Sequence, residues 1–135
     1  MKLFELLEGY AVHPDFADTL KQGLTARGLA NYAADQITMA DLSSQKNNRE
    51  EHIRRAIASI SKAYSIYQLP IYLYDMACFL EMTVNGRNEA KNTFKLFLKR
   101  QSEYKPGQLD GIIMQDRDID YATKDAANKL CGATK

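Results

Sequence analysis

The clearest helical pattern in the sequence is that of residues 71–106, IYLYDMACFLEMTVNGRNEAKNTFKLFLKRQSEYKP. Apolar residues recur three and four positions apart on both sides of Asn85-Gly86, which is typical of two amphipathic helices joined by a turn. We expect Gly86 to adopt the left-handed backbone conformation that ends many helices. Pro106 closes the stretch, because proline donates no N–H and clashes with the preceding helical turn. The stretch therefore predicts a helical hairpin with helices over 71–84 and 87–103.

The helical spacing continues on both sides of this hairpin. Towards the N-terminus it predicts four helices, over residues 3–10, 15–28, 29–45 and 49–67. The expected breaks are His13-Pro14, Gly28, Lys46-Asn47-Asn48 and Pro70. After Pro106 the pattern is looser, until Asp118 or Asp120 caps a final helix that runs through Leu130. The sequence thus predicts an all-α chain of about six to seven helices.

The chain contains an internal repeat. A shift of 37 residues places Met39-Ala40 on Met76-Ala77 and the turn residue Asn48 on Asn85. The same shift matches the apolar residues of the second helices, Ile53, Ile57 and Ile60 on Ala90, Phe94 and Phe97. A helix pair cannot bury its apolar seam alone, so we expect the two pairs to stack into one core.

The segment from Tyr74 to Leu80, the Asn85-Gly86 turn and the following Ala90, Phe94 and Phe97 together resemble a tetratricopeptide repeat, or TPR. The chain departs from that family in its longer period and in Phe97, where the family prefers alanine. The resemblance implies antiparallel hairpins stacked as a short right-handed array. A helical bundle of another kind is the alternative.

The length of 135 residues fits a single domain. Within it we distinguish four segments: an N-terminal helix pair (1–28), a degenerate repeat (29–70), the TPR-like repeat (71–106) and a C-terminal capping segment (107–135).

The resemblance also implies a concave groove, lined by the first helix of each pair, that binds a protein or peptide. The residues projected into it from 71–84 are Tyr74, Cys78, Glu81 and Met82. Those projected from 29–45 are Ile37, Asp41, Ser44 and Gln45. In a short array the terminal segments can instead close the groove, and both outcomes stay open at the level of sequence.

Three other features carry weaker indications. Arg87, Lys91, Lys95 and Lys99 recur every four residues and form a basic stripe. The stripe is either a solvated face, a site for phosphate or an acidic peptide, or a surface onto which the aspartates of the tail fold back. The tyrosines near Pro70 indicate either a packed junction or a binding surface, because tyrosine is enriched at interfaces; they are Tyr64, Tyr67, Tyr72 and Tyr74. His52 is expected on a solvated helix face.

The composition and motifs argue against several classes of protein. The net charge of +1 gives no global attraction to nucleic acid or to an anionic membrane, and no apolar run approaches the length of a membrane span. We find no phosphate-binding loop, metal-ligand spacing or nucleophile motif, so we expect no cofactor, no metal and no enzyme. The sequence predicts a cytoplasmic protein-interaction module. The alternatives are a homodimeric structural protein and a small enzyme without a recognisable motif.

Overall fold

The computed structural model describes residues 14–107, 109–114 and 117–132, and these residues form an all-α structure. The helices within them are α2 (Pro14–Leu42), α3 (Lys46–Ile66), α4 (Pro70–Glu81), α5 (Arg87–Glu103), α6 (Asp110–Met114) and α7 (Ile119–Gly132). The helix predicted over residues 3–10 lies outside the described residues.

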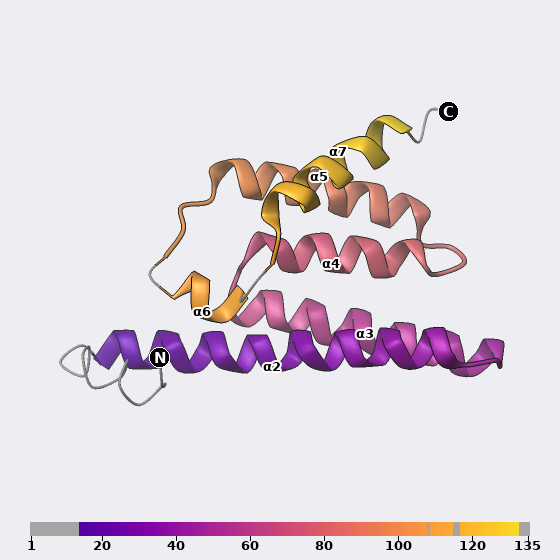
Figure 1. Ribbon diagram of the computed structural model, residues 1–135, viewed down its shortest axis with the longest axis horizontal. Coiled ribbons are helices and arrows are strands. Elements are labelled where there is room, and N and C mark those ends of the chain that lie inside the picture. Colours follow the sequence, from indigo (N-terminus) through magenta and orange to yellow (C-terminus); the bar gives the residue numbers. More distant parts are fainter. Residues whose placement is uncertain (1–13, 108, 115–116, 133–135) are drawn as a thin grey trace.

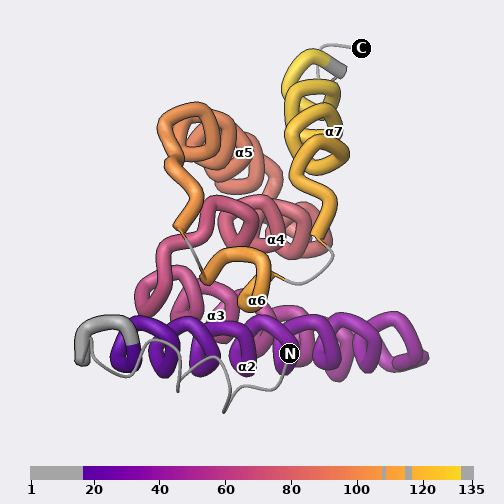
Figure 2. The backbone as a smooth tube through the Cα atoms, turned by 60° about the vertical axis from the view of Figure 1, so that its left-hand side comes forward, coloured from indigo at the N-terminus to yellow at the C-terminus, as the bar shows by residue number. Residues whose placement is uncertain are grey.

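The helices form two stacked antiparallel hairpins, which confirms the predicted fold class (Figure 1). The first hairpin consists of α2 and α3, and the second consists of α4 and α5. Helix α4 packs on α3, and α7 packs on the opposite side of the second hairpin, against both α5 and α4 (Figure 2). The short α6 packs on α2. Helix α4 is therefore the centre of the stack.

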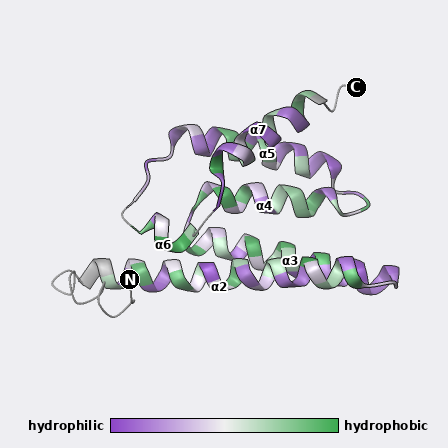
Figure 3. Ribbon diagram, viewed as in Figure 1, coloured by the Kyte–Doolittle hydropathy of each residue, from purple (hydrophilic) through white to green (hydrophobic). Residues whose placement is uncertain are grey.

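The hydropathy of α4 explains this central place. Figure 3 shows that α4 is hydrophobic along most of its length, and a helix of that kind must be covered on several sides. Leu73 and Ala77 of α4 are buried, as are Phe94 and Phe97 of α5. Ala40 and Ala77, the small residues that the repeat matches to each other, are both fully buried.

The first hairpin packs closely because α2 presents a row of alanines. Ala26, Ala33 and Ala40 recur every seven residues and have no exposed surface. Their small size lets α3 come near enough for the Ser59 hydroxyl to donate to the Leu29 carbonyl oxygen at 2.7 Å. His52 also takes part in this contact, since it is half-buried and its Nδ1 lies 2.7 Å from Oε1 of Gln36. The expectation that His52 lies on a solvated face was wrong.

The predicted break at Gly28 was also wrong, because α2 continues through it as one helix. A glycine in a helix interior costs about 1 kcal/mol relative to alanine. The buried alanines on either side of Gly28 offset that cost by packing on α3. The segment boundary predicted between residues 28 and 29 consequently falls inside a helix.

Gly23 has a different role in the same helix, because it lies under α6. A β-carbon built at Gly23 would lie 2.1 Å from Cδ1 of Ile113, so the missing side chain makes room for α6 to pack. The side chain of Ile113 is buried at this contact. Gly23 therefore sets how closely α6 approaches α2.

The turns and helix ends were predicted with mixed success. Asn48 lies inside α3 rather than in a turn, since α2 ends at Leu42. Gly86 has a φ of −93°, so it is not left-handed; its β-carbon would lie 2.2 Å from the carbonyl oxygen of Leu80, and the turn needs glycine for space. The cap at Asp118 is confirmed, because the Tyr121 N–H donates to its Oδ1 at 2.9 Å.

Candidate functional site

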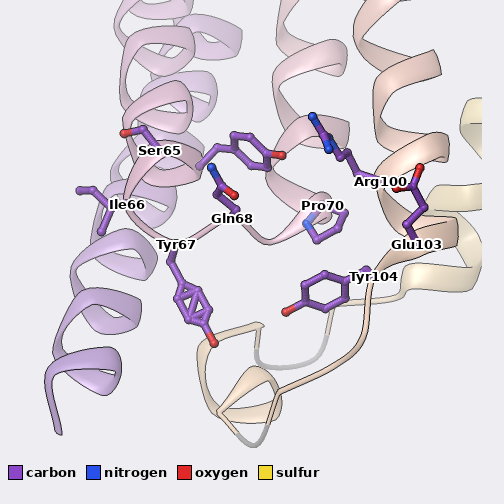
Figure 4. Close-up of a pocket in the computed structure, with 9 residues that line it drawn as sticks. Ser65, Ile66, Tyr67, Gln68, Pro70, Arg100, Glu103 and Tyr104 are labelled. Carbon is purple, nitrogen blue, oxygen red and sulfur yellow. The ribbon is translucent and has the colours of Figure 1, made fainter. Parts of the chain in front are cut away.

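A cavity of about 600 Å³ lies at the end of the two hairpins where α3 leads into α4. We call it the tyrosine cavity. It is lined by Tyr64, Ser65, Ile66, Tyr67, Gln68, Pro70, Arg100, Glu103 and Tyr104. Figure 4 shows Tyr67 and Tyr104 on either side of the opening, with their hydroxyls directed towards the turn below. The walls come from the last turn of α3, the connection to α4 and the last turn of α5.

Asp110 holds the two tyrosines in place from beneath. Its carboxylate is almost fully buried and accepts three hydrogen bonds, from the Tyr104 hydroxyl at 2.6 Å, the Tyr67 hydroxyl at 3.1 Å and the Gly107 N–H at 3.1 Å. Burial, together with the neighbouring Asp110, raises the pKa of Tyr67 to about 12. Burial and the hydrogen bond to Asp110 also raise the pKa of Tyr104. Both rings are therefore fixed and neutral at ordinary pH.

The rim of the tyrosine cavity carries opposite charges. Arg100 and Glu103 are exposed on the last turns of α5, and within the described residues neither forms a salt bridge. Gln68 is exposed on the facing side. The arrangement combines an aromatic wall with a cation and a carboxylate that face solvent. Such a site can bury an apolar group and pair with a charge next to it.

The groove predicted from the TPR-like pattern is covered on its α4 side by α7. The Tyr74 hydroxyl donates to Oδ2 of Asp125 at 2.6 Å, and Lys129 Nζ lies 2.8 Å from Glu81 Oε1. The same Lys129 Nζ lies 3.9 Å from the sulfur of Cys78. Of the two outcomes that the sequence left open, closure by a terminal segment is the one observed here. Met82 is half-buried at the C-terminal end of α4.

The residues predicted to line the groove from the earlier segment do not join those of α4. Ile37 is half-buried against the core, while Asp41, Ser44 and Gln45 are exposed near the far end of α2 and in the turn after it. Helix α3 lies between α2 and α4 in the stack (Figure 2). The two sets of residues do not line one groove, because α4 packs on α3 and not on α2.

The acidic tail does not fold onto the basic stripe in the described residues. Asp110 binds the cavity tyrosines, Asp118 caps α7 and Asp125 binds Tyr74, so these carboxylates have other partners. Arg87, Lys95 and Lys99 of the stripe are exposed. Asp116 lies outside the described residues. Lys91 is half-buried, so the stripe is solvated at three of its four positions.

The sequence identified only part of the cavity. The tyrosines near Pro70 divide into three environments: Tyr64 and Tyr67 line the cavity, Tyr72 is buried, and Tyr74 lies beneath α7. Tyr104, Arg100 and Glu103 were not predicted. The available signal was Tyr104 beside Pro106, which repeats the tyrosine and proline pairing of Tyr67 and Pro70.

Searches for other kinds of site and for related proteins gave negative results. In the part of the chain that the structure describes, no three His, Cys, Asp or Glu side chains converge as a metal site would require. No helix among the described residues is long and apolar enough to cross a membrane. The chain matches no protein-family model, no curated protein and no solved structure.

Proposed function

We propose that this chain is a non-enzymatic interaction module that binds a peptide segment of another protein in the tyrosine cavity. The observation that carries the proposal is the cavity of about 600 Å³ with tyrosine walls and a charged rim. Ligand sites in proteins have volumes of about 300–1,000 Å³ and combine apolar walls with a few polar groups. Tyrosine supplies a rigid contact surface at a small cost in conformational entropy.

The lining indicates which peptide would fit. Because Asp110 fixes Tyr67 and Tyr104 before binding, their ordering costs no free energy when a ligand arrives. An apolar or aromatic side chain would pack between these rings. Arg100 would then bind a carboxylate one or two residues away in the ligand, since guanidinium groups pair with carboxylates through two parallel hydrogen bonds.

A displayed library of random peptides, selected on the folded chain, tests this function. We expect enrichment of an apolar or aromatic anchor followed by Asp or Glu. Arg100→Glu should shift the selected residue beside the anchor to Lys or Arg. The matched control Lys95→Glu, an exposed position of the same helix outside the cavity, should leave the selection unchanged. Equal shifts in both variants, or no enrichment on either, would contradict the proposal.

We extend the proposal to the repeat and the compartment. The α4–α5 hairpin is a TPR-like unit and α2–α3 its degenerate copy, supported by the burial of the matched residues Ala40, Ala77, Ile60 and Phe97. The compartment is the cytoplasm, supported by Cys78, which forms no disulfide.

A homodimer is a second candidate, favoured by an apolar flank on α2. Tyr32, Met39 and Leu42 follow one side of the helix, and Leu42 has 81% of its surface exposed. Light scattering at high protein concentration tests this candidate. A dimer that Leu42→Glu converts to a monomer would support it, and a monomer throughout would exclude it.

A further inference from the structure

Helix α7 binds the second hairpin through one face with a regular pattern. Its inward residues Ala122, Asp125, Ala126 and Lys129 stand at positions i, i+3, i+4 and i+7, which fall on one side of a helix. The two alanines are fully buried. Asp125 and Lys129 lie beside them and supply the polar contacts. The inward face of α7 therefore carries small side chains and charged side chains at fixed positions.

The surface that receives this face is built from α4 and α5, and we call it the α7 seat. Tyr74, Cys78 and Glu81 of α4 contact Asp125 and Lys129 as described above. Lys129 Nζ also lies 5.1 Å from the ring centroid of Phe94 on α5, a cation–π distance. The Tyr74 ring packs against Phe94 and Phe97 with centroid separations of 5.9 and 5.5 Å. The seat is therefore ordered by its own aromatic packing as well as by α7.

The attachment of α7 is weak compared with that of the other long helices. Among its described side chains only Ala122 and Ala126 are buried, whereas α4 and α5 bury residues as large as Leu73, Phe94 and Phe97. Burial stabilises in proportion to apolar area, so two alanines contribute little. Its other contacts come from the partly buried Ile119 and Leu130, which pack against the core, and from polar groups. The polar contacts include the Arg117–Asp75 pair just before the helix, where a guanidinium N–H donates to Oδ2 at 2.8 Å. Segments held in this way open more readily than the core.

We propose that the α7 seat also binds a helix from a partner protein in place of α7, and that this helix carries α7's pattern of small residues at i and i+4, an acid at i+3 and a lysine at i+7. The occupant follows from charge and size. Glu81 favours a cation, the half-buried Tyr74 hydroxyl favours an acceptor, and the surface facing Ala122 and Ala126 has room only for small side chains. Helix α7 is the resident example of such a ligand.

The probe for this site is a synthetic peptide of residues 119–132, titrated onto the full-length chain. The resident α7 competes at a high effective concentration, so binding to the wild-type chain is weak. Arg117→Gln removes the Asp75 pair, which lies outside the peptide, and should tighten peptide binding about threefold. Arg55→Gln removes the exposed Arg55–Glu51 pair of α3, and as the matched control it should leave peptide binding unchanged.

Two further measurements make the test specific. A peptide with Ala126→Leu should bind about tenfold more weakly, because the larger side chain does not fit the seat. With an isotope-labelled chain and unlabelled peptide, saturation should accelerate hydrogen exchange of the chain's own α7 amides while those of α3 stay protected.

The second of these measurements needs only the wild-type chain, so it remains decisive if Arg117→Gln does not fold. Failure of the peptide to bind at saturating concentration, equal binding of the leucine peptide, or unchanged exchange of α7 would overturn the proposal. None of these results bears on peptides selected by the tyrosine cavity, which is a separate surface.

Discussion

The α7 seat and the tyrosine cavity use the same local bond with opposite results. In each, a tyrosine hydroxyl donates to an aspartate at 2.6 Å, from Tyr74 to Asp125 in the seat and from Tyr104 to Asp110 in the cavity. Asp125 belongs to a helix of 14 residues that packs against both α5 and α4. Asp110 begins a helix of 5 residues that packs on α2 and leaves the opening clear. The length and direction of the element that carries the acceptor, rather than the bond itself, determine whether a surface is closed.

The largest predicted effect comes from removing Asp110, the acceptor that holds the two tyrosines of the cavity. Asp110→Ala removes the acceptor of three hydrogen bonds and leaves partly buried donors without a partner, so we expect a loss of about 3 kcal/mol in the free energy of unfolding. Urea denaturation measures it. Asp120→Ala, at an exposed position, is the control and should cost less than about 0.5 kcal/mol. A loss at Asp110 no larger than the control would show that the carboxylate does not organise the cavity.

The next largest effect comes from overpacking the contact between α7 and the α7 seat. Ala126→Leu places a large side chain where alanine has no exposed surface, and overpacking of this kind costs about 2 kcal/mol. We expect the cost to appear as faster hydrogen exchange confined to α7, with the first hairpin unchanged. Lys124→Leu introduces the same residue on the exposed side of α7 and should leave exchange as it was. Uniformly faster exchange in all helices would contradict a separately attached α7.

A matched pair of smaller changes compares the two bonds directly. Tyr74→Phe and Tyr104→Phe each delete one hydroxyl and keep the ring, and each should cost about 1 kcal/mol in the free energy of unfolding. Their consequences should differ in place, because Tyr74→Phe loosens α7 while Tyr104→Phe loosens the loop before α6. Hydrogen exchange of the two segments distinguishes them. Identical exchange patterns in the two variants would count against the comparison.

The smallest predicted effect is a loss of stability at alkaline pH, caused by the raised pKa values of Tyr67 and Tyr74. Burial raises the pKa of Tyr67 from 10.0 to about 12, and burial followed by the bond to Asp125 raises that of Tyr74. A raised pKa means that the unfolded chain loses these protons first as pH rises. The contribution of these two tyrosines to stability should therefore be constant below about pH 10 and fall between about 10 and 12. Urea midpoints across that range measure the fall, which should be shallower in Tyr67→Phe; a midpoint independent of pH there would refute the assignment.

Local sequence predicted the parts of the fold in which local signals and packing agree. The bounds of α5 were predicted without error, because the apolar spacing around Phe94 and Phe97 coincides with breaks on both sides. The cap of the last helix was predicted at Asp118 or Asp120, and the structure places it at Asp118. The helix end predicted at Gly28 was wrong, because the preference of glycine to end a helix is weaker than the packing of the alanines that flank it.

The candidate sites were harder to predict because they depend on contacts between distant segments. Tyr74 and Glu81 have the same spacing in the sequence whether their groove is open or covered, and only the position of α7 decides between the two. The cavity joins Tyr67 to Asp110, 43 residues later, through a short helix with no amphipathic signal. The tyrosine cluster near Pro70 indicated a surface of interest, but not which of its members faces solvent.

The contact of α6 with Gly23 also bears on the order in which the chain folds. The first hairpin brings together residues close in sequence, such as Gln36 and His52, 16 positions apart. Seating α6 on α2 instead joins Arg27 to the carbonyl of Ile112, 85 positions apart. Closing so long a loop costs more chain entropy, and topologies rich in distant contacts fold more slowly. We therefore expect the first hairpin to assemble before α6 docks over Gly23, so that the tyrosine cavity acquires its floor after its α3 wall has formed.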